Sequence, residues 1–191
     1  MKRLLLTTTF VAAALLANPY ESKPEEIAAV KATGQKASAA LLKSLGGNLQ
    51  KHLQSGGPME AFGFCSDHAY TMTEAVDQSM GSDVSVKRIS LKYRNPVNAP
   101  QGSEKAILES LETLQANGVV LPDEVVEVIG DGVYKYYKPL LINKEACLKC
   151  HGDIDKLPEL AKAIRERYPE DKATGYRMND LRGAVVVTVK H

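Results

Sequence analysis

Residues 125–152 read VVEVIGDGVYKYYKPLLINKEACLKCHG, and this stretch predicts how the chain arranges its fold around its chemistry. Apolar and aromatic residues at 125–129 and 133–141 predict two strands. Between them, Asp131-Gly132 is typical of a tight β-hairpin turn. The hairpin runs into two cysteines and a histidine, so we expect the reactive residues to lie at the end of an antiparallel sheet.

The reactive residues form the motif Cys147-Leu-Lys-Cys150-His151. Two cysteines separated by two residues and followed at once by histidine are typical of c-type haem attachment. Each thiol would add to one vinyl group of the same porphyrin, and the histidine would bind the iron as the proximal ligand. The motif therefore predicts Cys147 and Cys150 as covalent anchors of one haem c and His151 as an iron ligand.

A Cys-x-x-Cys pair also occurs in zinc sites and in thioredoxin-like redox centres. Zinc takes about four ligands in tetrahedral geometry, and Cys65 together with the three motif residues would supply that number. A thioredoxin-like pair would open a helix within a βαβ unit, and no such pattern surrounds the motif. The zinc site stays open as a minor alternative, which an absence of visible absorbance in the purified protein would favour.

The N-terminus predicts export. Lys2 and Arg3 precede an apolar run to Ala17, which is the pattern of a secretory signal peptide and is short for a bilayer span. We expect residues 1–17 to be removed, with an uncleaved N-terminal membrane anchor as the alternative. Removal leaves 22 basic against 23 acidic residues, a net charge of −1. A periplasmic location agrees with the motif, because bacterial haem c attachment takes place outside the cytoplasmic membrane.

The remaining pattern predicts a single α+β domain over residues 24–190. Of the 191 residues, 44% are hydrophobic, which is enough for one core. No basic patch with interleaved aromatic residues suggests nucleic-acid binding, and the mature chain contains no predicted membrane span. Helices are expected at residues 24–55, 58–79, 103–117 and 157–167, with further strands at 84–93 and 184–189. The first of these strands shows an apparent slip in register near Arg88.

Two residues of the second predicted helix are candidate iron ligands. Cys65 lies on the apolar face of this helix, and His68 lies about one turn further on. Burial as a small apolar side chain is the alternative for Cys65. Either residue could bind an iron opposite His151, but not both.

Four segments together resemble one known family. They are residues 88–100 (RISLKYRNPVNAP), 134–141 (YKYYKPLL), 147–152 (CLKCHG) and 168–187 (YPEDKATGYRMNDLRGAVVV). In this order they are similar to the single-haem c-type proteins with a PAS-like fold, formerly known as a domain of unknown function. Members occur as small periplasmic proteins and as sensory modules of bacterial signalling proteins.

The resemblance implies a sheet of about five antiparallel strands, flanking helices and one covalently bound haem. It also implies that a cysteine on an N-terminal helix is the ligand opposite the motif histidine. The family's Cys-Ser pattern matches Cys65-Ser66, so the resemblance makes Cys65 the expected sixth ligand. A thiolate ligand would lower the reduction potential of the iron relative to His/Met ligation.

Contacts with the porphyrin are expected from basic and aromatic residues. Arg94 and Lys138 are candidate partners of the haem propionates, with Arg88, Lys92 and Arg177 as further candidates. Tyr136 is a candidate for packing against the ring. Solvated surface charges and an ordinary core position are the alternatives for these residues.

These patterns together predict an exported haem protein that acts in electron transfer or redox sensing with a partner protein. The alternative is a sensor module for diatomic gases, in which the gas displaces Cys65 and changes the spectrum of the reduced protein. We expect no enzymatic activity, because an iron bound by both His151 and Cys65 has no open position.

Overall fold

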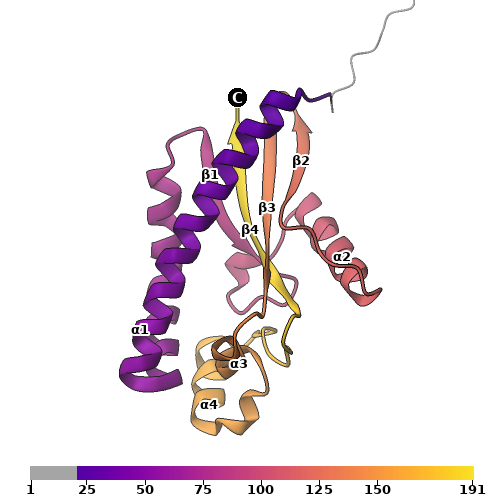
Figure 1. Ribbon diagram of the computed structural model, residues 1–191. Helices are drawn as coiled ribbons and strands as arrows, with labels where there is room; N and C mark the ends of the chain where they lie inside the picture. The colour runs from indigo at the N-terminus through magenta and orange to yellow at the C-terminus, as the bar shows by residue number, and fades with distance from the viewer. Residues whose placement is uncertain (1–20) are drawn as a thin grey trace, which may run out of the picture.

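The computed structural model describes residues 21–191 (Figure 1). The signal peptide expected at residues 1–17 lies outside the described residues. Within the described part, no helix combines the length and the apolar character that crossing a membrane requires. The helices and strands in chain order are α1 (Pro24–Ser79), β1 (Val84–Ile89), α2 (Ser103–Ala116), β2 (Val125–Gly130), β3 (Val133–Leu141), α3 (Glu145–His151), α4 (Pro158–Arg167) and β4 (Leu181–Lys190).

The four strands of the described chain form one antiparallel sheet in the order β1-β4-β3-β2. β2 and β3 form the predicted hairpin, and Asp131 (φ 52°) and Gly132 (φ 73°) both have the positive φ that a type I′ turn needs. β4 pairs with β1 on one side and with β3 on the other. The α+β prediction is confirmed, and the arrangement is consistent with a PAS-like fold, with four strands described where about five were expected.

α1 consists of two helical arms joined by a sharp turn at Gly57. Gly57 (φ 72°, ψ −161°) is the position where α1 leaves helical geometry, and glycine adopts positive φ without steric cost. Pro58 then fits the first turn of the second arm, where its missing N–H is not needed. The first arm crosses one face of the sheet and the second arm returns to β1 (Figure 1). The two helices predicted around this glycine are therefore present.

Both faces of the sheet are buried. On the face covered by α1, Val30, Ala37 and Leu41 pack against strand residues Val86, Tyr134, Tyr136, Val185, Val187 and Val189. On the face covered by α2, Leu108 and Leu111 pack against Ile89, Tyr137, Leu181, Ala184 and Val186. We call these the α1 face and the α2 face. Consecutive residues of one strand therefore enter different apolar clusters.

Burial of both faces explains why the predicted register slip near Arg88 is wrong. β1 pairs with β4 without interruption, from Val84 opposite Val189 to Ile89 opposite Ala184. Because Val86 enters the α1 face while Ile89 enters the α2 face, the apolar pattern changes phase although the strand does not. The strand also ends at Ile89 rather than near residue 93.

α3 and α4 lie together at the end of the sheet remote from the C-terminus (Figure 1). The cysteine motif lies on the short helix α3. The tip of the α1 hairpin reaches the same end of the molecule, and α1 contacts both α3 and α4. This end brings the N-terminal half of the chain to the motif.

Candidate functional site

α3 presents its three reactive residues on one side. Cys150 and His151 follow Cys147 by three and four positions, which places each of them one helical turn from Cys147. Cys147 packs beside a buried cluster of Ile142, Ala173 and Tyr176. Cys150 packs beside a different cluster, formed by Phe62 of α1 with Ile154, Leu160, Ala161 and Ile164. Both thiols are free and partly buried, so they are available for covalent chemistry within apolar surroundings.

The imidazole of His151 is held in one tautomer. Its Nδ1 lies 2.8 Å from the Ala173 carbonyl oxygen, which can only accept a hydrogen bond. Nδ1 therefore carries the proton, and Nε2 keeps a lone pair for a metal or other acceptor role. Burial, together with the positive charges of Arg182 and Arg94, lowers the pKa of His151 well below its ordinary value. The ring is therefore neutral at physiological pH.

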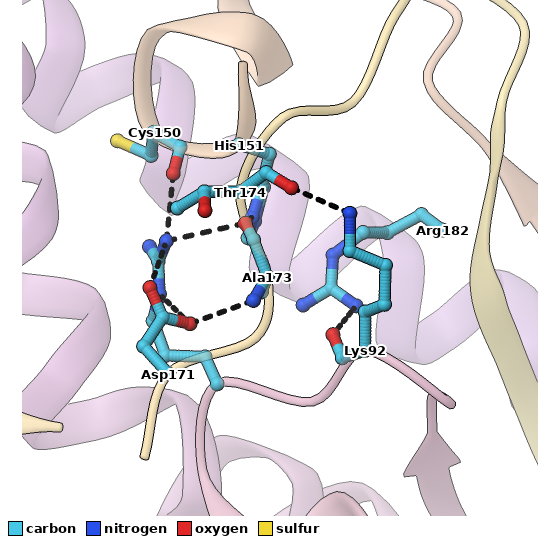
Figure 2. Close-up of polar contacts among 8 residues, drawn as sticks. Lys92, Cys150, His151, Asp171, Ala173, Thr174 and Arg182 are labelled. Carbon is cyan, nitrogen blue, oxygen red and sulfur yellow. Dashed lines mark hydrogen bonds and ion pairs between the residues drawn. The ribbon is translucent and has the colours of Figure 1, made fainter. Parts of the chain in front are cut away.

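Arg94 fixes the loop that supplies the Ala173 carbonyl. Its guanidinium binds both carboxylate oxygens of Asp171, at 3.2 and 3.1 Å, and Asp171 in turn accepts from the Ala173 backbone N–H at 2.9 Å. The same guanidinium donates to the Cys150 carbonyl at 2.7 Å. Figure 2 shows these contacts as one connected network. Arg94 thus ties the end of α3 to the loop that orients His151.

Two further cations surround Tyr176, whose ring lies edge-on to His151 with centroids 6.2 Å apart. Lys92 Nζ lies 4.3 Å from the Tyr176 ring centroid and donates to the Thr174 carbonyl at 2.6 Å. The Arg182 guanidinium lies 5.4 Å from the same ring. Cations over an aromatic face are favourable, so Tyr176 helps to hold positive charge beside the imidazole.

Cys65 approaches the motif from the second arm of α1. It is a partly buried free thiol, and burial raises its pKa, while the positive charges of Arg88 and Arg94 lower it. The pKa of Cys150 is likewise raised, mainly by burial, although the positive charge of Arg94 lowers it; Cys65 and Cys147 raise it further. The helices that carry the two thiols, α1 and α3, are also in contact. The structure therefore brings Cys65 to the motif from a segment far away in sequence.

His68, the other candidate ligand, is exposed. Its ring packs on Phe64, with centroids 4.7 Å apart, and His52 stacks on the same phenyl ring at 3.9 Å. Within residues 21–191, no group of three or more His, Cys, Asp or Glu side chains is arranged to hold a single metal ion. The described residues therefore give no support to the alternative of a tetrahedral zinc site.

The three predicted porphyrin contacts lie in different surroundings, and their roles stay predictions. Arg94 is at the motif but is engaged by Asp171, with 13% of its side chain exposed. Lys138 Nζ donates to the Asp123 carbonyl beside β2 at 2.9 Å. Tyr136 is 1% exposed within the α1-face core, and a Cβ on Gly34 would lie 2.1 Å from its Cγ. The Tyr136 ring is thus pressed against the backbone of α1.

The sequence did not single out Asp171, Tyr176 or Arg182 as site residues. All three lie in residues 168–187, where the sequence suggested the family resemblance and a strand at residues 184–189. Their partners are remote, since Arg94 and Asp171 are 77 positions apart. Local spacing in the sequence does not show which remote residues these side chains contact, so only the tertiary structure identifies them as part of the site.

Comparisons with known proteins agree on one family. The family described as "Tll0287-like: Tll0287" matches residues 17–190. The solved structure titled "Crystal structure of the cyanobacterial heme-protein Tll0287" superposes with a TM-score of 0.61 at 23% sequence identity, covering 89% of this chain and 98% of that chain. At this identity the likeness establishes the shared fold. No curated protein sequence matches the chain.

Proposed function

The chain belongs to the Tll0287-like family, and on that premise we propose that it is an exported haem-binding protein with one covalently attached haem c. In this proposal Cys147 and Cys150 carry the thioether bonds. His151 is the proximal iron ligand and Cys65 the ligand on the other side. The related cyanobacterial structure is described as that of a heme-protein, which supports the same class of cofactor here.

The observation that carries the proposal is the hydrogen bond from His151 Nδ1 to the Ala173 carbonyl. A metal-binding histidine usually donates its other ring N–H to a carbonyl or carboxylate, which fixes its orientation. This contact leaves Nε2 as the free donor atom on the residue that directly follows the two cysteines. The lowered pKa of His151 keeps that atom unprotonated.

The donor set fits a haem better than a single small ion. Two thiols flank separate apolar clusters, which suits attachment to two separated vinyl groups of a flat, largely apolar ring. Cys65 adds a third sulfur from a different helix, and no set of three donors converges on one point within the described chain. A bound haem would supply an iron that can gain and lose one electron.

The chain's own residues would hold and shield that iron. Arg94 and Asp171 keep the loop and the imidazole in place, and the cluster around Phe62 and Ile164 excludes water from the Cys150 side. His151 and Cys65 would both hold the iron, so the proposed role is electron transfer or redox sensing through a partner protein, in the periplasm, without enzymatic activity. Displacement of Cys65 by CO or NO would instead indicate gas sensing.

The test is the optical spectrum of the full-length protein produced with a haem-attachment system. We expect an alkaline pyridine haemochrome spectrum typical of two thioether bonds, which changes in Cys147→Ser and in Cys150→Ser. Cys65→Ala should change the ferric bands of the intact protein, whereas the matched His68→Ala should leave them unchanged. A purified wild type without visible absorbance would overturn the proposal and favour zinc. Identical spectra for Cys65→Ala and wild type would remove Cys65 as a ligand.

A further inference from the structure

Arg88 and Arg182 are two partly buried cations, and neither pairs with a carboxylate within residues 21–191. Arg88 Nη2 donates to the Ala69 carbonyl of α1 at 3.2 Å, and its Nε is buried without a hydrogen-bond partner. Arg182 Nη1 donates to Ser90 Oγ at 2.7 Å and to the Lys92 carbonyl at 3.2 Å. The acceptors in these hydrogen bonds are all neutral oxygens, and neither guanidinium forms an ion pair within residues 21–191.

The two guanidiniums also lie close enough to repel each other. Burial lowers the pKa of Arg88, and the positive charge of Arg182 lowers it further. Arg94 adds a third nearby positive charge, but its own charge is balanced by Asp171. Burying like charges without a counter-ion is unfavourable. Such an arrangement is more typical of a ligand site than of a structural core.

Both residues lie beside the candidate iron ligands. The charge of Arg88 acts on Cys65, and the charge of Arg182 acts on His151. Arg182 also lies over the Tyr176 ring that contacts His151. The two unbalanced positive charges therefore occur at the same end of the molecule as the proposed haem.

We propose that Arg88 and Arg182 bind the two propionate carboxylates of the haem, an inference that rests on the proposed haem function. Two carboxylates would balance the two positive charges, and one would supply the acceptor that Arg88 Nε lacks. Arginine forms strong charge-assisted hydrogen bonds with carboxylates. The assignment moves propionate recognition to Arg182, which the sequence did not single out, and away from Arg94 and Lys138, whose donors have other partners.

The test compares two porphyrins that differ only in these carboxylates. The full-length chain, prepared without haem attachment, is titrated with ferric protoporphyrin IX and with its dimethyl ester, and binding is followed by absorbance. We expect the ester to bind at least about tenfold more weakly, as lost charge-assisted hydrogen bonds require. Arg88→Met and Arg182→Met should each weaken binding of the free acid and leave binding of the ester unchanged.

Two further variants keep the test independent of misfolding. Arg88→Lys, which retains the charge, should still prefer the free acid, and the exposed Arg177→Met should behave like wild type. The melting temperature of the haem-free chain should rise in Arg88→Met, because the substitution removes an unbalanced buried charge. A fall in melting temperature would show that Arg88 stabilises the empty fold, which would overturn the assignment.

The remaining outcomes separate this inference from the proposed function. Equal affinity of wild type for the two porphyrins would overturn the propionate assignment and leave haem binding intact. Equal affinity combined with Arg88-dependent binding of glutarate would assign the pair to a free dicarboxylate instead. If neither porphyrin binds and the protein made with a haem-attachment system also lacks haem, the proposed function itself is overturned.

Discussion

Lys87 and Arg88 are neighbours in β1, yet their charges meet opposite surroundings. Lys87 points to the α2 face, where its Nζ lies 2.8 Å from Glu104 Oε1. Lys135 reaches the same carboxylate at 3.2 Å, and the Gln101 backbone N–H donates to its other oxygen at 2.9 Å. Arg88 contacts α1, where it finds a single backbone carbonyl.

The difference separates a completed charge cluster from an incomplete one. Glu104 is 1% exposed, and every part of its carboxylate has a donor or a cation, so the α2-face cluster is self-sufficient. Near the motif, Arg88 and Arg182 have no carboxylate partner within residues 21–191, and Arg88 Nε has no acceptor. One cluster therefore attaches α2 to the sheet, whereas we propose that a ligand completes the other. Each prediction below asks whether this contrast holds.

The largest effect is expected for Glu104→Gln. Removing the carboxylate leaves two lysines facing a buried neutral amide and should lower the free energy of unfolding by about 3 kcal/mol. Urea denaturation of the haem-free chain measures it. Glu109→Gln, in an exposed pair with Lys105 on the same helix, is the matched control and should change stability by less than about 0.5 kcal/mol. Equal changes in the two variants would contradict a self-sufficient cluster.

Arg94→Met should have the next largest effect. The substitution leaves the carboxylate of Asp171, whose side chain is 6% exposed, without its cation. We therefore expect the free energy of unfolding to fall by about 2 kcal/mol. Arg165→Met removes a comparable arginine–aspartate pair at the surface and should lose less than about 1 kcal/mol. In the haem-loaded protein, Arg94→Met should also alter the ferric spectrum, since the Ala173 carbonyl loses its support. An unchanged spectrum would limit Arg94 to a structural role.

Lys87→Met tests the comparison most directly when set beside Arg88→Met. Glu104 would keep Lys135, so we expect Lys87→Met to lower the free energy of unfolding by about 1 kcal/mol. Arg88→Met, one residue further along the strand, should raise it in the haem-free chain. Chemical denaturation of both variants measures whether each substitution raises or lowers the free energy of unfolding. If both substitutions lower the free energy of unfolding, the contrast between a paired and an unpaired charge cluster is contradicted.

The smallest effect concerns pH. Burial by itself would raise the pKa of Glu104, but hydrogen bonds from Lys87 and from the Gln101 backbone outweigh it, and the pKa is lowered from 4.5. A carboxyl group with a lowered pKa in the folded state stabilises above its unfolded pKa and loses that contribution as pH falls through the folded value. The stability gap between wild type and Glu104→Gln should therefore narrow below about pH 4. A gap independent of pH would exclude ionised Glu104 as its source.

Much of the fold is visible in local sequence. Gly57 followed by Pro58 divides α1, Asp131-Gly132 makes the β2–β3 turn, and the apolar spacing of residues 103–117 predicts α2. Each of these signals acts within a few residues of the structure it produces. The predicted slip near Arg88 failed because period-two reasoning assumes one buried face, and here both faces are apolar.

The candidate site divides in the same way. Cys147, Cys150 and His151 are recognisable as a candidate site from their spacing alone, because attachment of a c-type haem requires that spacing. The contacts that orient His151 depend on the pair between Arg94 and Asp171, which are remote in sequence. The Arg182 guanidinium likewise lies over the Tyr176 ring only because the chain folds back between them. Only the tertiary structure shows which arginines are already paired. For that reason the sequence favoured Arg94 as an anion partner, whereas we propose Arg88 and Arg182 for that role.

The position of β4 has a consequence for the order of assembly. β4 follows every other described element in the chain, yet it lies in the middle of the sheet and is the strand that joins β1 to the β2–β3 hairpin. Until residues 181–190 are in place, β1 has no partner strand, and contacts between distant segments form slowly. The cysteines of α3 are thus synthesised before the sheet can close. Under the proposed function, an enzyme that attaches haem could reach these cysteines while β1 is still unpaired.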